Sequence, residues 1–446
     1  MENDYLIQRK PLYALFIFAL PIIIGNLFQQ MYTMADSAIV GRFVSEQALA
    51  AVGASYSLTN IFICIAIGGG MGASVLVSQY FGAKNYAKMK LAMTTAFLTF
   101  LVVSIVLGGV GLLFSEHILL LLNTPLDIMD MAVEYLNIYF LGLPFLFMYN
   151  VLSSMFNALG KSRIPLYFLI FSSVFNVVLD LILVINFDMG VAGVAWATLI
   201  AQGISVVLSF LVFRREISRF DNGSDGFFSK EELGGMIRIA LPSILQQSTV
   251  SIGMMLVQSV VNSFGFEALA GYSAATRVES LCIVPMSGIG NAMSSYAAQN
   301  VGAGKQDRVV QGYRAANCMV IACAVIICIG LECFYNPLIH LFLGADGTQT
   351  AVATAKGYLT FMGWFFCLIG FKMCVDSVLR GSGDMAIFTI SNLVNLALRV
   401  IIAMTMAPRF GIALVWYAVP AGWFANWAIS YARYRTGKWR TAKARH

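Results

Sequence analysis

The chain has 446 residues, of which 59% are apolar and only 11% are charged. A soluble globular domain carries about 25% charged residues, so this chain has too few charges to cover a water-exposed surface of its size. The composition also excludes intrinsic disorder, which requires low hydrophobicity and high charge. The sequence therefore predicts a polytopic membrane protein. The formal charge is +6, and because the basic residues lie in short loops and at the tail, it reflects membrane topology rather than nucleic-acid binding.

Apolar runs that are long enough to cross a bilayer as helices occur throughout the chain. In chain order they fall near residues 12–40, 48–78, 91–114, 131–156, 164–186, 191–213, 236–262, 268–298, 313–335, 353–379, 385–407 and 411–432. These runs predict twelve transmembrane helices and an all-α fold. The first run is too long for a cleaved signal peptide and eleven further spans follow it, so we expect it to be the first membrane helix.

Lysine and arginine are distributed unequally between the two sides of these spans. Of the 28 basic residues, twenty-one lie in the termini and the even-numbered connections, and two, Arg42 and Arg409, lie on the opposite side. Loops rich in Lys and Arg are retained in the cytoplasm. The sequence therefore predicts a multi-pass protein of the plasma (bacterial inner) membrane with both termini in the cytoplasm.

The two halves of the chain resemble each other at an offset of about 220 residues. ALP at 19–21 returns at 240–242, EQALA at 46–50 as EALA at 267–270, SQYFGAK at 78–84 as AQNVGAGK at 298–305, FNVVLD at 175–180 as VNLALR at 394–399, and GVAGVAW at 190–196 as GIALVW at 411–416. Each half has six spans, so we expect a pseudo-twofold axis along the membrane normal and a central cleft. We predict an amino-terminal lobe (1–213), a cytoplasmic linker (214–235) and a carboxyl-terminal lobe with a basic tail (236–446).

In the predicted amino-terminal lobe, Asp36 late in the first span and Asp180 in the fifth are acidic residues well inside apolar sequence. A carboxylate inside the membrane costs at least ~2.5 kcal/mol on insertion scales, so each is a candidate functional residue. Asn176 lies one turn before Asp180 on the same helical face, and Thr198 lies in the sixth span at a similar depth. Periodicity alone does not show that these side chains face one another. The structural alternative is an interfacial Asp36 and an Asp180 paired with a hydroxyl or an amide.

Several segments are similar to the multidrug and toxic compound extrusion (MATE) transporters, within a superfamily that includes lipid-linked oligosaccharide flippases. They are LPIIIGNLFQQMYTMADSAIVGR at 20–42, SQYFGAKN at 78–85, NVVLDLILV at 176–184, GVAGVAWAT at 190–198 and AQNVGAGK at 298–305. The resemblance covers roughly residues 10–435. It implies a V-shaped fold of two six-helix bundles that expels cationic amphipathic compounds in exchange for protons or sodium. It also implies that Asp36, Asn176, Asp180 and Thr198 form a cation-binding site, as in prokaryotic members.

Either coupling ion suits these four side chains, because two close carboxylates share a proton and the same oxygens can bind sodium. Pro21, in the first span, removes the hydrogen bond to the Ile17 carbonyl and marks a kink. This kink is either a static bend or a hinge that moves when the charge at Asp36 changes. Tyr32, one turn before Asp36, either hydrogen-bonds into the site or simply packs against it.

The carboxyl-terminal lobe has a different set of charges. Its seventh span has no acidic residue, and in the tenth span Asp376 lies one turn from Lys372 and one turn from Arg380. This spacing predicts an intrahelical ladder of ion pairs rather than a second cation site.

Three further charged residues, Arg277, Glu279 and Arg399, lie inside predicted spans eight and eleven. Arg399 occupies the repeat position of Asp180, so the two lobes differ in charge at equivalent places. The depths of Glu279 and Arg399 predict an ion pair between these spans. A role in substrate binding or gating is the alternative.

Other functions fit the sequence less well than a drug exporter. A flippase or an exporter of a lipid-linked or endogenous metabolite would use the same scaffold and stays the alternative. An intramembrane enzyme is disfavoured because HExxH and GxSxG motifs are absent and the three histidines lie in predicted loops or the tail. We expect no cofactor, no metal site beyond sodium at the four residues above, and no nucleic-acid partner. The expected partners are small organic cations and the lipid bilayer, and the expected oligomeric state is a monomer.

Overall fold

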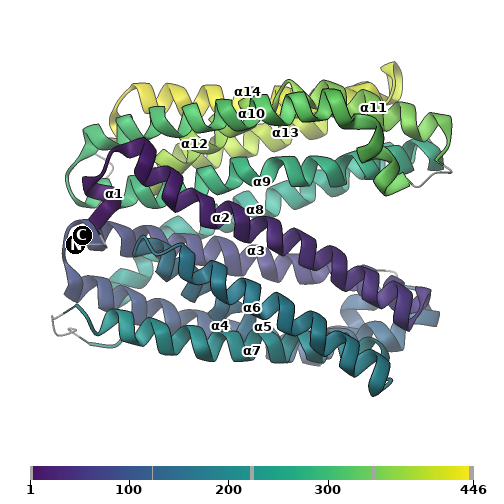
Figure 1. Cartoon of the computed structure of the whole chain (residues 1–446), viewed down its shortest axis with the longest axis horizontal. Helices are drawn as coiled ribbons and strands as arrows, with labels where there is room; N and C mark the ends of the chain where they lie inside the picture. The colour runs from purple at the N-terminus through teal and green to yellow at the C-terminus, as the bar shows by residue number, and fades with distance from the viewer. Residues whose placement is uncertain (1–3, 123, 221–225, 344–346, 441–446) are drawn as a thin grey trace. The chain divides into compact units, whose positions relative to one another are not determined.

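The computed structural model describes residues 4–122, 124–220, 226–343 and 347–440, and every regular element within these ranges is a helix (Figure 1). A short helix, α1 (Tyr5–Gln8), precedes the first long one. By contacts the chain divides into two compact units, residues 24–244 and residues 1–23 with 245–446.

The unit of residues 24–244 is a bundle centred on α5. Its helices are the second part of α2 (Pro11–Ile39), α3 (Glu46–Gly82), α4 (Tyr86–Leu121), α5 (Met129–Ala158), α6 (Arg163–Leu181), α7 (Gly190–Ile217) and the first part of α8 (Lys230–Asn262). Short π-helical turns, Val40–Val44 and Ile182–Asn186, extend α2 and α6, and a 3-10 turn, Leu126–Ile128, precedes α5. Helix α5 packs against α3, α4 and α7 around a buried apolar cluster that includes Phe62, Phe140 and Phe147.

The other unit is a bundle in which α9 and α12 each pack against several other helices. Its helices are α1, the first part of α2, the second part of α8, α9 (Phe266–Gly302), α10 (Gln306–Leu343), α11 (Gln349–Gly363), α12 (Phe366–Ser382), α13 (Met385–Phe410) and α14 (Ala413–Arg435), followed by the 3-10 turn η5 (Lys438–Arg440). Helix α9 packs against α10, α11 and α12, and α13 packs along α14.

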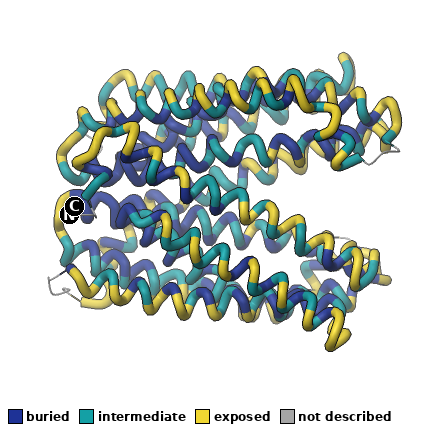
Figure 2. Tube along the Cα trace, viewed as in Figure 1, coloured by how far each residue is buried: buried dark blue, intermediate teal, exposed yellow. Residues whose placement is uncertain are grey.

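The helices have the length and surface of membrane spans. Among the described residues, nine helices are long and apolar enough to cross a bilayer, and α11 with α12 adds a tenth span. Helices α9 and α14, with 37 and 23 residues, have the length but carry more polar residues. Exposed positions run along the helices and not only at their ends (Figure 2); on α4, for example, Val102, Ile105 and Leu113 are all more than half exposed. The predicted all-α polytopic fold with about twelve spans is therefore confirmed.

The tenth span differs from the prediction of a single helix over 353–379. It consists of α11 and α12, which meet at an angle of 53°. The break follows Gly363, and the backbone of Phe365 has ψ near 0° instead of a helical value. Glycine weakens a helix because it has more conformational freedom to lose, and it favours a break at this point.

The first helix of each predicted half contains a proline beside the boundary between the two units. In α2 the boundary follows Ile23, two residues after Pro21, and in α8 it follows Ile244, two residues after Pro242. Each of these helices therefore contributes residues to both units. The lobe limits at residues 213 and 236 follow from the sequence repeat and stay a prediction.

Helix α8 approaches α3 closely at two glycines one turn apart. A Cβ atom at Gly68 would lie 2.6 Å from the Cα atom of Ile244, and one at Gly72 would lie 2.6 Å from the Cα atom of Ala240. Only glycine permits this approach of two backbones, which is a common way of packing helices in membranes.

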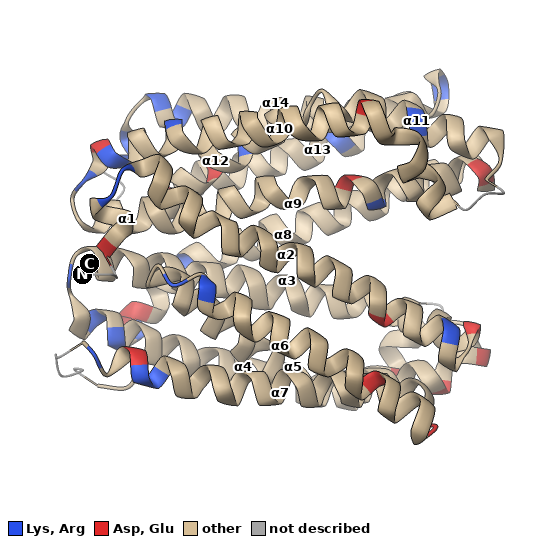
Figure 3. Ribbon diagram, viewed as in Figure 1, with Lys and Arg blue, Asp and Glu red and all other residues tan. Residues whose placement is uncertain are grey.

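Charged side chains are concentrated near the helix ends in each unit (Figure 3). In the unit of residues 24–244, most acidic residues gather at one end of the bundle and most Lys and Arg residues at the other (Figure 3). This is the pattern from which cytoplasmic termini are predicted, and the orientation itself stays a prediction.

Candidate functional site

Two helices of the 24–244 unit change to π-helical geometry just after an aspartate. Asp36 lies four residues before the turn Val40–Val44, and Asp180 lies two residues before the turn Ile182–Asn186. The two turns contact each other and α7. Their contact is apolar and is made by Val40, Val184, Val191 and Val194 with Ala48. Because π-helical turns are frequent at functional sites, this junction is a candidate for one, and it brings the two aspartates together.

The carboxyl groups of Asp36 and Asp180 lie close enough to interact directly with each other. Asp180 is fully buried, and Asp36 is partly buried. Two carboxyl groups this close inside an apolar bundle repel each other when both are ionised, and a shared proton relieves that repulsion. Among the described residues, the Oδ1 atom of each aspartate has no hydrogen-bond partner. The pair therefore keeps two acceptor atoms that bind to no described residue.

Asn176 connects Asp180 to Thr198. In the amide orientation that satisfies both neighbours, its Nδ2 donates to Asp180 Oδ2 at 3.0 Å, and its Oδ1 accepts from the Thr198 backbone N–H at 3.1 Å. Asn176 is 2% exposed, so this orientation is held inside the bundle. The hydroxyl of Tyr32 lies near the side chains of Thr198, Asp36 and Asp180. The structure thus brings Asp36 together with Asn176, Asp180, Thr198 and Tyr32. For Tyr32, simple packing was the alternative.

One neighbour of the carboxyl pair escapes sequence reasoning. Tyr135 of α5 lies close enough to Asp36 and Asp180 for both to act electrostatically on its hydroxyl. In the sequence it is one of several tyrosines in an apolar span, so its type and position alone give no reason to select it. Pro21 lies fifteen residues before Asp36 on α2, which continues through it as one helix.

In the carboxyl-terminal half, Asp376 has one of its predicted ion-pair partners on α12 and also joins a buried network with α13 and α14. Lys372 Nζ lies 3.4 Å from Asp376 Oδ2, as the sequence spacing predicts. Ser430 of α14 donates to Asp376 Oδ1 at 2.6 Å, and Asn392 of α13 donates to Asp376 Oδ2 at 3.3 Å. Arg380 donates to Ser294 Oγ of α9 at 3.1 Å. Asp376 thus has a charged partner and two neutral donors, which is a complete set of partners for a structural carboxylate.

Glu279 has a different neighbour from the one that its sequence position predicts. Its Oε2 accepts a hydrogen bond of 2.5 Å from the hydroxyl of Tyr358. Arg399 acts on it electrostatically, but among the described residues no salt bridge joins Glu279 to Arg399 or to Arg277. Arg277 is exposed. The Nε atom of Arg399 is buried, and it has no hydrogen-bond partner among the described residues.

Known proteins resemble this chain over nearly its whole length. The MatE family model matches twice, at residues 21–182 and 242–405, in agreement with the internal repeat. The chain is 30% identical over 439 residues to the probable multidrug resistance protein YpnP of Bacillus subtilis (strain 168), covering 98% of this chain and 97% of that protein. It is 28% identical over 432 residues to the probable multidrug resistance protein YoeA of the same organism, covering 94% and 92%.

The fold agrees with these matches. A crystal structure of MATE in complex with MaL6 superimposes with a TM-score of 0.91 at 21% identity, covering 99% of this chain and 100% of the other. The two family matches, the relatives and the helical architecture lead to one assignment: the chain belongs to the MATE family of membrane transporters.

Proposed function

We propose that this protein is an antiporter that exports amphipathic organic cations in exchange for protons, and that the proton binds between Asp36 and Asp180. The observation that carries the proposal is the close pair of carboxyl groups, one of which is fully buried. Membership of the family and two relatives named as probable multidrug resistance proteins support export of drug-like compounds.

The pair can couple transport because its charge changes when a proton binds. Without the proton, two negative charges share a site inside an apolar bundle, and their repulsion and desolvation disfavour that state. With the proton, one charge is removed and the hydrogen bond between the carboxyl groups forms. A proton then shifts the balance between two conformations of the transporter by its differential affinity for them. Asn176, Thr198 and Tyr32 would act as positioning residues that fix the carboxyl groups.

Sodium is the alternative coupling ion, since the two unused carboxylate oxygens and the oxygens of Asn176 and Thr198 are the hard ligands that such a cation prefers. A lipid-linked or endogenous metabolite is the alternative substrate. The proposal also includes a monomer in the plasma membrane with cytoplasmic termini, and bending of α2 at Pro21 as the site changes charge.

The test is transport by the purified protein in proteoliposomes. Ethidium transport should follow an imposed proton gradient at constant sodium, and it should not respond to a sodium gradient at constant pH. The reverse result would replace the proton by sodium at the same site. If neither gradient moves ethidium, and the protein transports a lipid-linked sugar or an anionic metabolite instead, the proposed substrate class is contradicted.

A further inference from the structure

A cavity of about 670 Å³ lies between α10, α12 and α14, and η5 lines one end of it. All its lining residues belong to the unit that contains residues 245–446. It is separate in sequence and in chemistry from the carboxyl pair, because no Asp or Glu lines it. The inference that follows does not depend on the proposed transport function.

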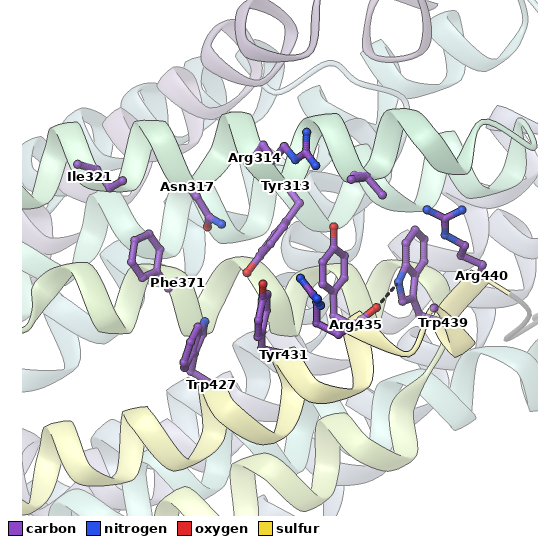
Figure 4. Close-up of a pocket in the computed structure, with 13 residues that line it drawn as sticks. Tyr313, Arg314, Asn317, Ile321, Phe371, Trp427, Tyr431, Arg435, Trp439 and Arg440 are labelled. Carbon is purple, nitrogen blue, oxygen red and sulfur yellow. Dashed lines mark hydrogen bonds between the residues drawn. The ribbon is translucent and has the colours of Figure 1, made fainter.

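Three arginines lie at one end of the cavity. Arg314 comes from the first part of α10, Arg435 ends α14, and Arg440 belongs to η5 (Figure 4). Arg440 is 3.5 Å from Asp307, an exposed side chain that is not part of the lining. Among the described residues, no salt bridge involves Arg314 or Arg435. The cavity would therefore repel the organic cations proposed as substrates and attract an anion.

The opposite end of the cavity is apolar. Ile321, Phe371 and Trp427 lie there, away from the arginines (Figure 4). Ile321 is seven residues beyond Arg314 on α10, so it lies about 10 Å farther along the helix. The site thus changes from cationic at the helix ends to apolar toward the middle of the spans, the direction in which a lipid changes from headgroup to acyl chain.

A column of stacked aromatic rings forms one wall of the cavity. Neighbouring centroids are 5.1 Å apart for Trp427 and Tyr431, 6.0 Å for Tyr431 and Tyr434, and 5.8 Å for Tyr434 and Trp439. Trp439 is 1% exposed, and its indole N–H donates to the Tyr434 carbonyl at 3.1 Å (Figure 4). These contacts fix η5 over the cavity. Tyrosine and tryptophan favour the level of lipid headgroups, because one end of each ring is polar.

We propose that this cavity binds an anionic phospholipid such as phosphatidylglycerol. Its phosphate would lie against Arg314 and Arg435, and its acyl chains would extend past Phe371 and Ile321. Guanidinium groups bind phosphate oxygens in a bidentate geometry, and basic pockets between transmembrane helices bind acidic headgroups. Anionic lipid bound here would hold η5 and the end of α14 against α10.

The test is binding of phosphatidylglycerol and phosphatidylcholine to the full-length protein in detergent, measured by native mass spectrometry. We expect a clear preference for phosphatidylglycerol. The double variant Arg314→Gln with Arg435→Gln should bind phosphatidylglycerol about tenfold more weakly and lose this preference, because contacts to a charged group are removed. Each single variant should lose part of the affinity. Size-exclusion chromatography would verify that each variant remains folded.

The matched control is Arg214→Gln with Arg215→Gln, which removes the same charge from exposed positions at the end of α7. This control should bind phosphatidylglycerol like the parent, and inorganic phosphate at millimolar concentration should not displace the lipid. Equal binding of the two lipids by the parent would overturn the proposal. Equal losses in the control and the cavity variant, or displacement by phosphate, would overturn it as well, since they would indicate general surface charge or a site for free anions.

Discussion

Asn176 links two elements of the carboxyl site, because its amide contacts Asp180 on α6 and Thr198 on α7. We expect Asn176→Ala to reduce coupled efflux roughly five- to tenfold, since a buried carboxylate loses a donor. Thr198→Ala should give a smaller loss because the backbone N–H of residue 198 still donates to Asn176. Initial rates of gradient-driven ethidium efflux would measure both effects.

The control for these variants is Thr99→Ala. Thr99 is on α4 of the same unit, and its Oγ1 has no partner among the described residues. Efflux by this variant should equal that of the parent. A loss at Thr99 as large as that at Asn176 would show that the assay responds to general damage and not to the carboxyl site.

Asp376 provides a second test at this scale, because its contacts indicate a structural role. Asp376→Asn should leave the choice of coupling ion unchanged, but it should destabilise the protein by roughly 3–5 kcal/mol, since the buried Lys372 would keep only Asn392 and lose its charged partner. Thermal unfolding in detergent would measure the loss. Adding Lys372→Gln should recover part of it. A change of coupling ion in folded Asp376→Asn protein would contradict this interpretation.

At the scale of single residues, the sequence identifies charged side chains by the free energy that it costs to place them in a membrane, and it does not show which residues they contact. Asp36 and Asp180 stand out because carboxylates are rare inside apolar spans. Glu279 stands out by the same reasoning, but its tyrosine partner does not, because Tyr358 lies 79 residues away and ordinary helical spacing gives no link between them. Tyr135 is missed for the same reason.

The close contact of α3 and α8 allows a test at the scale of helices. Gly72→Val should destabilise the protein by about 1–3 kcal/mol, because even a Cβ atom would lie 2.6 Å from the backbone of Ala240. Gly109→Val on α4 is the control, as nothing lies within 4 Å of its Cβ position. Unfolding temperatures in detergent should fall for the first variant and change little for the second. Equal changes would contradict the packing of these two helices.

Helix positions are predictable from apolar run length, but helix irregularities are not. The predicted first span over 12–40 corresponds closely to α2, and the predicted eleventh over 385–407 to α13. The π-helical turns after Asp36 and Asp180 have no signal in hydropathy, because a π turn changes hydrogen bonding without changing composition. The bend between α11 and α12 is hidden for a similar reason, since Gly363 is followed by an aromatic run that continues the apolar segment.

At the scale of the whole molecule, the distribution of charge predicts the orientation in the membrane. Single cysteines at Lys230 and Asp127, in a background whose eight native cysteines are replaced by alanine, should react differently with an impermeant thiol reagent. Cysteine at 230 should react only after the membrane is permeabilised, and cysteine at 127 should react in intact cells. Permeabilised cells provide the control for accessibility. Labelling of both positions in intact cells would contradict cytoplasmic termini.

The sequence repeat predicts two related halves, but it does not show how the chain is divided between the two compact units. The repeat compares each helix with its equivalent in the other half, and it contains no information about which helices pack together. For this reason the change of unit after Ile23 and after Ile244 was not predicted. Both changes occur two residues after a proline of the repeated ALP motif, so the repeat does mark the positions once the structure is known.

The central claim is that the Asp36–Asp180 pair couples proton movement to export. The most direct measurement compares two activities of Asp36→Asn and Asp180→Asn in proteoliposomes with matched protein content: ethidium transport driven by a proton gradient, and exchange of labelled for unlabelled ethidium without a gradient. An amide cannot cycle between charged and neutral forms, so gradient-driven transport should be lost, while exchange should remain because substrate can still bind. Asp127→Asn, an exposed carboxylate outside the site, should behave like the parent. Near-normal gradient-driven transport by both site variants would contradict the account.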